Sequence, residues 1–217
     1  RLFWIPPGRS PHDGAYVRYA VEEMLAIVAV ESHRHGCMVV GEDLGTVEDA
    51  MREVLARADV LSYRLLYFEK QQGGGFTLPA AYPAAALVAI STHDLATLAG
   101  WWSGHDLRLR LALGLFPDPR LFDAQLLDRA QERIRLTLAV REAGLLSADE
   151  AAQALSLAVP SPRITQAVHA FLAAAPSALM VFQLEDVAGE VEQANMPGTT
   201  DTHPNWRRKL APSVQEL

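Results

Sequence analysis

Two acidic side chains in this sequence stand at the ends of short, largely apolar runs. Glu42 follows residues 38–41, and Asp94 ends the run 86–94, after Ser91, Thr92 and His93. If both runs are strands of one barrel, the two carboxylates face each other across its mouth. Paired carboxylates suit glycosidic bond cleavage, because one protonates the leaving oxygen while another attacks or stabilises the sugar cation. The same pattern also fits acids that cap the next helix or face solvent.

Other polar and aromatic side chains suit the same chemistry. His93, beside Asp94, is a candidate for binding a sugar hydroxyl or a metal, and it equally fits a half-buried structural histidine. Aromatic rings stack on the apolar faces of sugars, and they also pack in ordinary cores. The candidate stacking residues are Tyr67, Phe68, Trp101, Trp102 and Trp206.

The sequence gives less support to a metal site or a phosphate-binding site. The single cysteine, Cys37, excludes a paired-cysteine zinc site within the chain, and we expect it to be a small core residue. The glycine run 73–75 lacks the lysine and the strand–loop–helix context of a phosphate loop. A metal-dependent barrel hydrolase with Glu42, His93 and Asp94 as ligands stays open as an alternative, although the other strand ends supply no histidine. We therefore expect no metal and no cofactor.

The elements that must position these residues alternate between extended and helical patterns. We expect strands at 38–43, 62–69, 86–94 and 178–186. We expect a helix over 21–34 that stops at Gly36, a helix from a capping pattern at 46–49 to about residue 58, and mostly helix over 105–175. Polar ends on successive strands, spaced for βα units, predict an α/β fold: a parallel barrel or an open doubly wound sheet.

The composition narrows the class of protein. The chain has 217 residues and a net charge of −7, which argues against non-specific nucleic-acid binding. No apolar run approaches the roughly 20 residues that a membrane-spanning helix needs. With one cysteine the chain suits a reducing compartment, so we expect a cytoplasmic protein. The sequence does not indicate the oligomeric state.

Several short strings go beyond general patterns. They are residues 41–47 (GEDLGTV), 91–95 (STHDL), 195–200 (NMPGTT) and 205–210 (NWRRKL), with further matches at 2–6 (LFWIP) and 66–69 (LYFE). Together, and in this order, they resemble the signatures of 4-α-glucanotransferases. This family, also called amylomaltases or disproportionating enzymes, is family 77 of the glycoside hydrolases, within the α-amylase clan. The resemblance runs along the whole chain.

The resemblance implies a fold and a set of roles. It implies the second half, strands 5–8, of a (β/α)₈ TIM barrel, with a helical insertion between strands 7 and 8. The implied parts are 1–104 for strands 5–7, 105–175 for the insertion, and 176–217 for the last strand and tail. Glu42 matches the general acid/base, and Asp94 the carboxylate that grips the reactive sugar. His93 and Asn195 match substrate-binding residues, and we add Tyr67 and Trp101 as expected sugar contacts.

The implied reaction is retaining transfer of an α-1,4-glucan segment to the 4-hydroxyl of another glucan, without a cofactor. The family's nucleophile is an aspartate in an Arg-x-Asp-His motif that should come a few residues before Arg1. Asp13, in a turn-like stretch, is no substitute. We therefore expect the 217 residues to be inactive alone and a longer parent to be the enzyme. A hydrolase of the same clan and a non-catalytic glucan-binding fragment stay open as alternatives.

Overall fold

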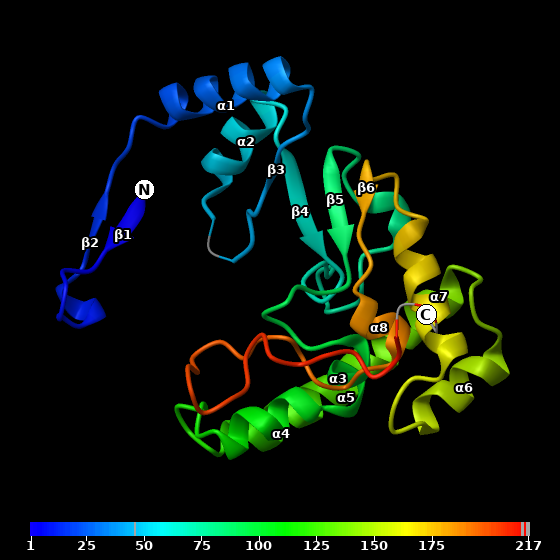
Figure 1. Ribbon diagram of the computed structural model, residues 1–217. Helices are drawn as coiled ribbons and strands as arrows, with labels where there is room; N and C mark the ends of the chain where they lie inside the picture. Colours follow the sequence, from blue (N-terminus) through cyan, green and yellow to red (C-terminus); the bar gives the residue numbers. More distant parts are fainter. Residues whose placement is uncertain (46, 214, 216–217) are drawn as a thin grey trace. The chain divides into compact units, whose positions relative to one another are not determined.

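The structure is a computed structural model that describes residues 1–45, 47–213 and 215 (Figure 1). The chain divides into two compact units, Arg1–Ser62 and Tyr63–Leu217. Each unit is described by itself below. Among the described residues, no helix combines the length and the apolar character needed to cross a membrane.

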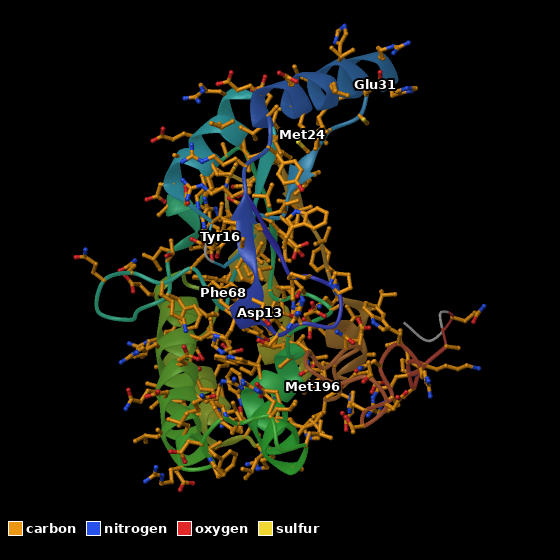
Figure 2. All side chains as sticks on the ribbon, turned by 90° about the vertical axis from the view of Figure 1, so that its left-hand side faces the viewer. Asp13, Tyr16, Met24, Glu31, Phe68 and Met196 are labelled. Carbon is orange, nitrogen blue, oxygen red and sulfur yellow. The ribbon has the colours of Figure 1, made fainter. Side chains whose placement is uncertain are left out.

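The first unit begins with a hairpin and a long helix. Strand β1 (Leu2–Trp4) pairs antiparallel with β2 (Ala15–Val17), and the 3₁₀ helix η1 (Pro11–Asp13) lies between them. Figure 2 labels Asp13 and Tyr16 in this hairpin. Helix α1 (Val21–His35) ends at Gly36, whose φ of 59° is the left-handed conformation that terminates helices. The predicted helix and its stop are confirmed.

The first unit also holds the start of a parallel sheet. Strand β3 (Val40–Gly41) pairs parallel with the beginning of β4 (Leu61–Leu65), with Val40 opposite Leu61, and α2 (Asp49–Arg57) connects them. The strand is shorter than the predicted 38–43, and Cys37 is exposed. The expectation of a core cysteine is wrong because this residue lies in the link before the strand. Thr46, the expected helix cap, lies outside the described residues.

The second unit continues the sheet through β4, β5 (Ala86–Ala89) and β6 (Leu179–Met180), in the order β3-β4-β5-β6. Strands β5 and β6 are parallel, so the α/β fold with a parallel sheet is confirmed. The predicted strand 178–186 is wrong at its end, because α8 (Leu184–Ala188) follows β6. The physical reason is tertiary, since the Asp186 carboxylate accepts a hydrogen bond from the backbone nitrogen of Leu98.

Helices fill the stretch between β5 and β6, as the sequence predicts (Figure 1). They are α3 (Leu98–Ser103), α4 (His105–Ala112), α5 (Leu121–Glu142), α6 (Ala148–Ser156) and α7 (Pro162–Ala173), and the 3₁₀ helix η2 (Pro79–Ala81) precedes β5. The Ser147 side chain accepts from the backbone nitrogen of Glu150, and the Glu150 carboxylate accepts from that of Ser147. This reciprocal cap confirms the predicted start of α6.

The hydrophobic core of the second unit includes side chains of α3. Trp101 and Trp102 on α3 pack with apolar side chains from β5, α5 and α7. The Arg129 guanidinium binds the Asp106 carboxylate through two hydrogen bonds of 2.8 and 2.9 Å and lies over the Trp101 ring. Because bidentate pairs fix geometry, this network holds α3 and α4 against α5. The helix that follows the β5–α3 loop is therefore held by its two neighbouring helices.

Candidate active site

Asp94 lies in the turn that joins β5 to α3. Its backbone nitrogen donates to the hydroxyl of Thr92 over 3.2 Å, and Thr97 caps the first turn of α3 by accepting from the nitrogen of Gly100. The Asp94 side chain is about half exposed. A carboxylate on a short turn after a parallel strand is where active sites of α/β proteins form. The predicted strand 86–94 is too long, because β5 ends at Ala89 and Asp94 lies in the loop that follows it.

A second segment, far away in the sequence, lies along this turn. The side-chain amide of Asn195 donates to Oδ1 of Asp94 over 2.6 Å, and the backbone nitrogen of Asn195 donates to the His93 carbonyl over 3.1 Å. The buried amide of Gln193 donates to the Asn195 carbonyl over 2.6 Å. The structure thus brings together three predicted residues, His93, Asp94 and Asn195. Gln193 was not predicted, since a lone glutamine in an aperiodic stretch gives no signal.

The segment that carries Asn195 is itself tied to the start of α3. Oδ1 of Asp186 accepts from the Leu98 nitrogen over 2.6 Å, and the Thr97 hydroxyl donates to the Glu190 carbonyl over 2.7 Å. Both contacts join residues more than 80 positions apart to the same helix end. They fix the direction of the chain between Asp186 and Asn195, so that the Asn195 amide reaches Asp94.

His93 completes the polar cluster and connects it to an aromatic ring. Its Nε2 lies 3.5 Å from Oδ1 of Asp94, with both side chains about half exposed. The His93 ring centroid is 5.0 Å from that of Trp206, at an interplanar angle of 45°. The cluster therefore offers a carboxylate, an amide and an imidazole to one ligand, next to an indole.

The loop before Trp206 is built around one asparagine side chain. Oδ1 of Asn205 accepts from the backbone nitrogen of Met196 over 2.9 Å, and Nδ2 donates to the Thr199 hydroxyl over 2.8 Å. Met196, labelled in Figure 2, is buried. Asn205 therefore ties the tail to the segment that carries Asn195.

Tyr67 and Trp101 belong to the hydrophobic core. They are 7% and 3% exposed, and their rings stack with centroids 5.1 Å apart at 13°. Burial raises the pKa of Tyr67 well above its ordinary value, so the phenol stays protonated. The structure groups these rings with the core rather than with the polar cluster, and their contact with substrate stays a prediction.

Glu42 lies in the first unit, directly after β3, with its side chain exposed. Its neighbour Asp43 is buried and lies 3.6 Å from the Arg52 guanidinium. The two adjacent acids thus differ, since Asp43 is held in an ion pair within the unit while Glu42 is accessible. The predicted pairing of Glu42 with Asp94 stays a prediction.

The alternative of a metal-dependent hydrolase requires a cluster of ligating side chains. Within the part of the chain that the structure describes, no group of three or more histidine, cysteine, aspartate or glutamate residues could hold a metal ion. Nothing in the geometry therefore favours this alternative over carboxylate chemistry.

The family model and the curated proteins that are similar to this chain all carry the same description. A sequence model of the family described as 4-alpha-glucanotransferase matches residues 1–214. A 4-alpha-glucanotransferase of Mycobacterium tuberculosis strain H37Rv is 40% identical over 217 residues, which is 97% of this chain and 28% of the relative. A 4-alpha-glucanotransferase of Haemophilus influenzae is 36% identical over 211 residues, which is 97% of this chain and 30% of the relative.

Two solved structures are also similar. The amylomaltase of Corynebacterium glutamicum has a TM-score of 0.86 and 32% identity, over 97% of this chain and 30% of that one. The Streptococcus agalactiae amylomaltase in complex with acarbose has a TM-score of 0.61 and 18% identity, over 98% of this chain and 34% of that one. At this identity, the likeness supports only a shared fold. The chain spans about 30% of the length of these relatives.

Proposed function

The chain belongs to the 4-α-glucanotransferase family, and we propose that it is part of an enzyme that transfers α-1,4-glucan segments between sugar chains. The observation that carries the proposal is the cluster of His93, Asp94 and Asn195 around the loop that follows β5. Because the chain covers about 30% of its relatives' length, the activity of the whole enzyme, and α-1,4-glucan as its substrate, are part of the proposal.

Asp94 is proposed to grip the hydroxyls of the reacting sugar. The 2.6 Å hydrogen bond from Asn195 holds Oδ1 in place, which leaves the orientation of the carboxylate fixed before substrate arrives. Pre-oriented charge stabilises a developing oxocarbenium ion without reorganisation at the moment of reaction. His93 is proposed to donate to a neighbouring sugar hydroxyl.

Glu42 is proposed as the general acid/base, in agreement with its exposed position after β3. Retaining chemistry also needs a nucleophilic carboxylate about 5–5.5 Å from the acid. Following the family resemblance, the proposal places that nucleophile outside these 217 residues.

The finer fold assignment is part of the same proposal. The parallel β5–β6 pair and the sheet order β3-β4-β5-β6 support strands 5–8 of a (β/α)₈ barrel. Helices α4–α7 support an insertion over 105–175, between the parts 1–104 and 176–217. The cytoplasmic location inferred from the single cysteine is likewise proposed.

A disproportionation assay tests the proposed function. The glucanotransferase fusion, in which these 217 residues follow the preceding part of the Mycobacterium tuberculosis relative, is compared with the 217 residues alone. With maltotriose, the fusion is expected to release glucose and longer maltodextrins, and the chain alone neither. Glucose and maltose without longer products would mean a hydrolase. Transfer by the chain alone would place the nucleophile within it, and a folded fusion that binds acarbose without turnover would leave a glucan-binding protein.

A further inference from the structure

The backbone at Trp206 adopts a conformation that bulky residues avoid. Its φ is 59°, in the left-handed region where a side chain meets its own backbone. Such a conformation persists where the surroundings impose it, and it concentrates at sites that use it. The Trp206 side chain is also 64% exposed, so burial of the indole does not explain the strain.

The surrounding contacts impose this conformation. The Trp206 nitrogen donates to the Ala194 carbonyl over 2.9 Å. The neighbouring Asn205 side chain binds the nitrogen of Met196 and the hydroxyl of Thr199. These contacts fix the backbone at Trp206 and at the residue before it, which gives the exposed ring a defined place.

The Trp206 indole lies next to the cluster of His93, Asp94 and Asn195. Ala194 accepts from Trp206, and the next residue, Asn195, binds both the His93 carbonyl and the Asp94 carboxylate. The His93 ring centroid lies 5.0 Å from the Trp206 centroid, and Nε2 of His93 lies 3.5 Å from Oδ1 of Asp94. One side chain, His93, therefore lies close to both the indole and the carboxylate.

A cavity of about 430 Å³ opens on the same indole. Its lining residues include Glu190, Glu192, Ala194, Trp206, Arg208 and Lys209. The Glu192 carboxylate lies 3.0 Å from Nε2 of His105 and 3.3 Å from the Arg208 guanidinium. The volume is within the usual range of small-molecule sites, about 300–1,000 Å³. Charged side chains beside an aromatic ring suit a ligand that carries many hydroxyls on apolar rings.

We infer that Trp206 is the stacking platform for the glucose unit next to the one that Asp94 holds, and that the glucan continues into this cavity. The inference rests on the proposed function and assigns a specific subsite to it. The apolar face of the pyranose covers the indole, while Glu190, Arg208 and Lys209 meet hydroxyls further along the chain. Trp206 therefore favours donor glucans that extend at least one glucose unit beyond the unit that Asp94 holds.

The competing explanation is that Trp206 only stabilises the protein. The two explanations differ for Trp206→Gly, because glycine tolerates a positive φ and relieves the strain while it removes the ring. The chain also offers a matched control in Phe182. This exposed ring stacks on His169, with centroids 5.5 Å apart, and it lines a different cavity.

The experiment measures initial transfer from maltoheptaose to glucose by the glucanotransferase fusion, with KM, kcat and melting temperature for each variant. Trp206→Ala and Trp206→Gly are expected to raise the maltoheptaose KM by about threefold to tenfold, with kcat little changed. Trp206→Phe is expected to restore most of the affinity, and Phe182→Ala to leave KM unchanged. Trp206→Gly is expected to melt no lower than the wild type.

An unchanged KM in Trp206→Ala and Trp206→Gly, in a fusion that transfers glucans, would overturn this inference and leave the proposed function intact. So would a Trp206→Gly variant that melts well below the wild type while its folded fraction keeps the wild-type KM. A folded fusion that neither transfers glucans nor binds acarbose would overturn the proposed function, and this inference with it.

Discussion

Replacing Asp186 by asparagine is expected to stabilise the protein at alkaline pH and to change little at acid pH. The Asp186 side chain is 0% exposed. Its Oδ1 accepts from the Leu98 nitrogen, while Oδ2 lies 3.8 Å from Nε2 of His169 and has no hydrogen-bond partner among the described residues. Burial raises the pKa of Asp186 from 3.8 to about 6, against the opposing effects of Leu98 and His169.

The sign of the effect follows from proton linkage. Because its pKa is higher in the folded protein, Asp186 binds its proton more tightly there than in the unfolded chain. Its contribution to stability is complete below about pH 4 and is lost as the pH rises through about 6. A pKa difference of about 2 units corresponds to about 3 kcal/mol. This sets the upper limit of the gain that a neutral side chain can give.

Asparagine fits the site for two reasons. Its oxygen keeps the hydrogen bond from Leu98, and its amide can donate to Nε2 of His169. That nitrogen is an acceptor in the tautomer assigned by the 2.8 Å contact of Nδ1 with the Thr165 carbonyl. We therefore expect Asp186→Asn to raise the free energy of unfolding by up to about 3 kcal/mol at pH 8 and by less than about 0.5 kcal/mol at pH 4.

Urea unfolding of the 217-residue chain between pH 4 and pH 8 measures this difference, followed by the fluorescence of the buried Trp101 and Trp102. The control variant is Asp128→Asn on the exposed side of α5, which is expected to show no comparable pH-dependent gain. The reasoning is refuted if Asp186→Asn destabilises the chain at pH 8, or if its effect is the same at pH 4 and pH 8.

Three further substitutions test the contacts around the site. Asn195→Ala is expected to lower kcat of the glucanotransferase fusion about tenfold or more, because Asp94 loses its orienting donor; an unchanged kcat contradicts this. Gly100→Ala places a methyl group against the Val191 carbonyl, and it is expected to cost about 1–3 kcal/mol in urea unfolding, where a neutral result would count against the packing. Ser147→Ala removes the cap of α6 and is expected to cost about 1 kcal/mol by the same measurement; no loss would mean that the cap is dispensable.

Local signals in the sequence were sufficient for several elements. The helix stop at Gly36 and the reciprocal cap of Ser147 with Glu150 involve residues within one turn of each other, so their chemistry can be read from the sequence. The parallel order of the strands also followed from their spacing. Strand lengths did not, because a run of apolar residues does not show where strand pairing ends.

The part of the prediction that was wrong depends on contacts between distant residues. The stretch at Leu184, Glu185 and Asp186 has the same apolar-to-acid pattern as a strand end, yet it is helical, with Asp186 bonded to the start of α3. The link between Asn195 and Asp94 spans 101 positions, and no periodicity of the sequence indicates it. Asp94 itself was recognisable from its place after a strand, while Asn195 came from the family resemblance.

The most direct test of the central claim is the transfer rate of the glucanotransferase fusion with and without Asp94→Asn, measured with maltotriose. The wild-type fusion is expected to transfer glucans, and Asp94→Asn is expected to lower kcat by about 100-fold or more while the melting temperature stays unchanged. A folded Asp94→Asn fusion that transfers glucans at the wild-type rate would contradict the account.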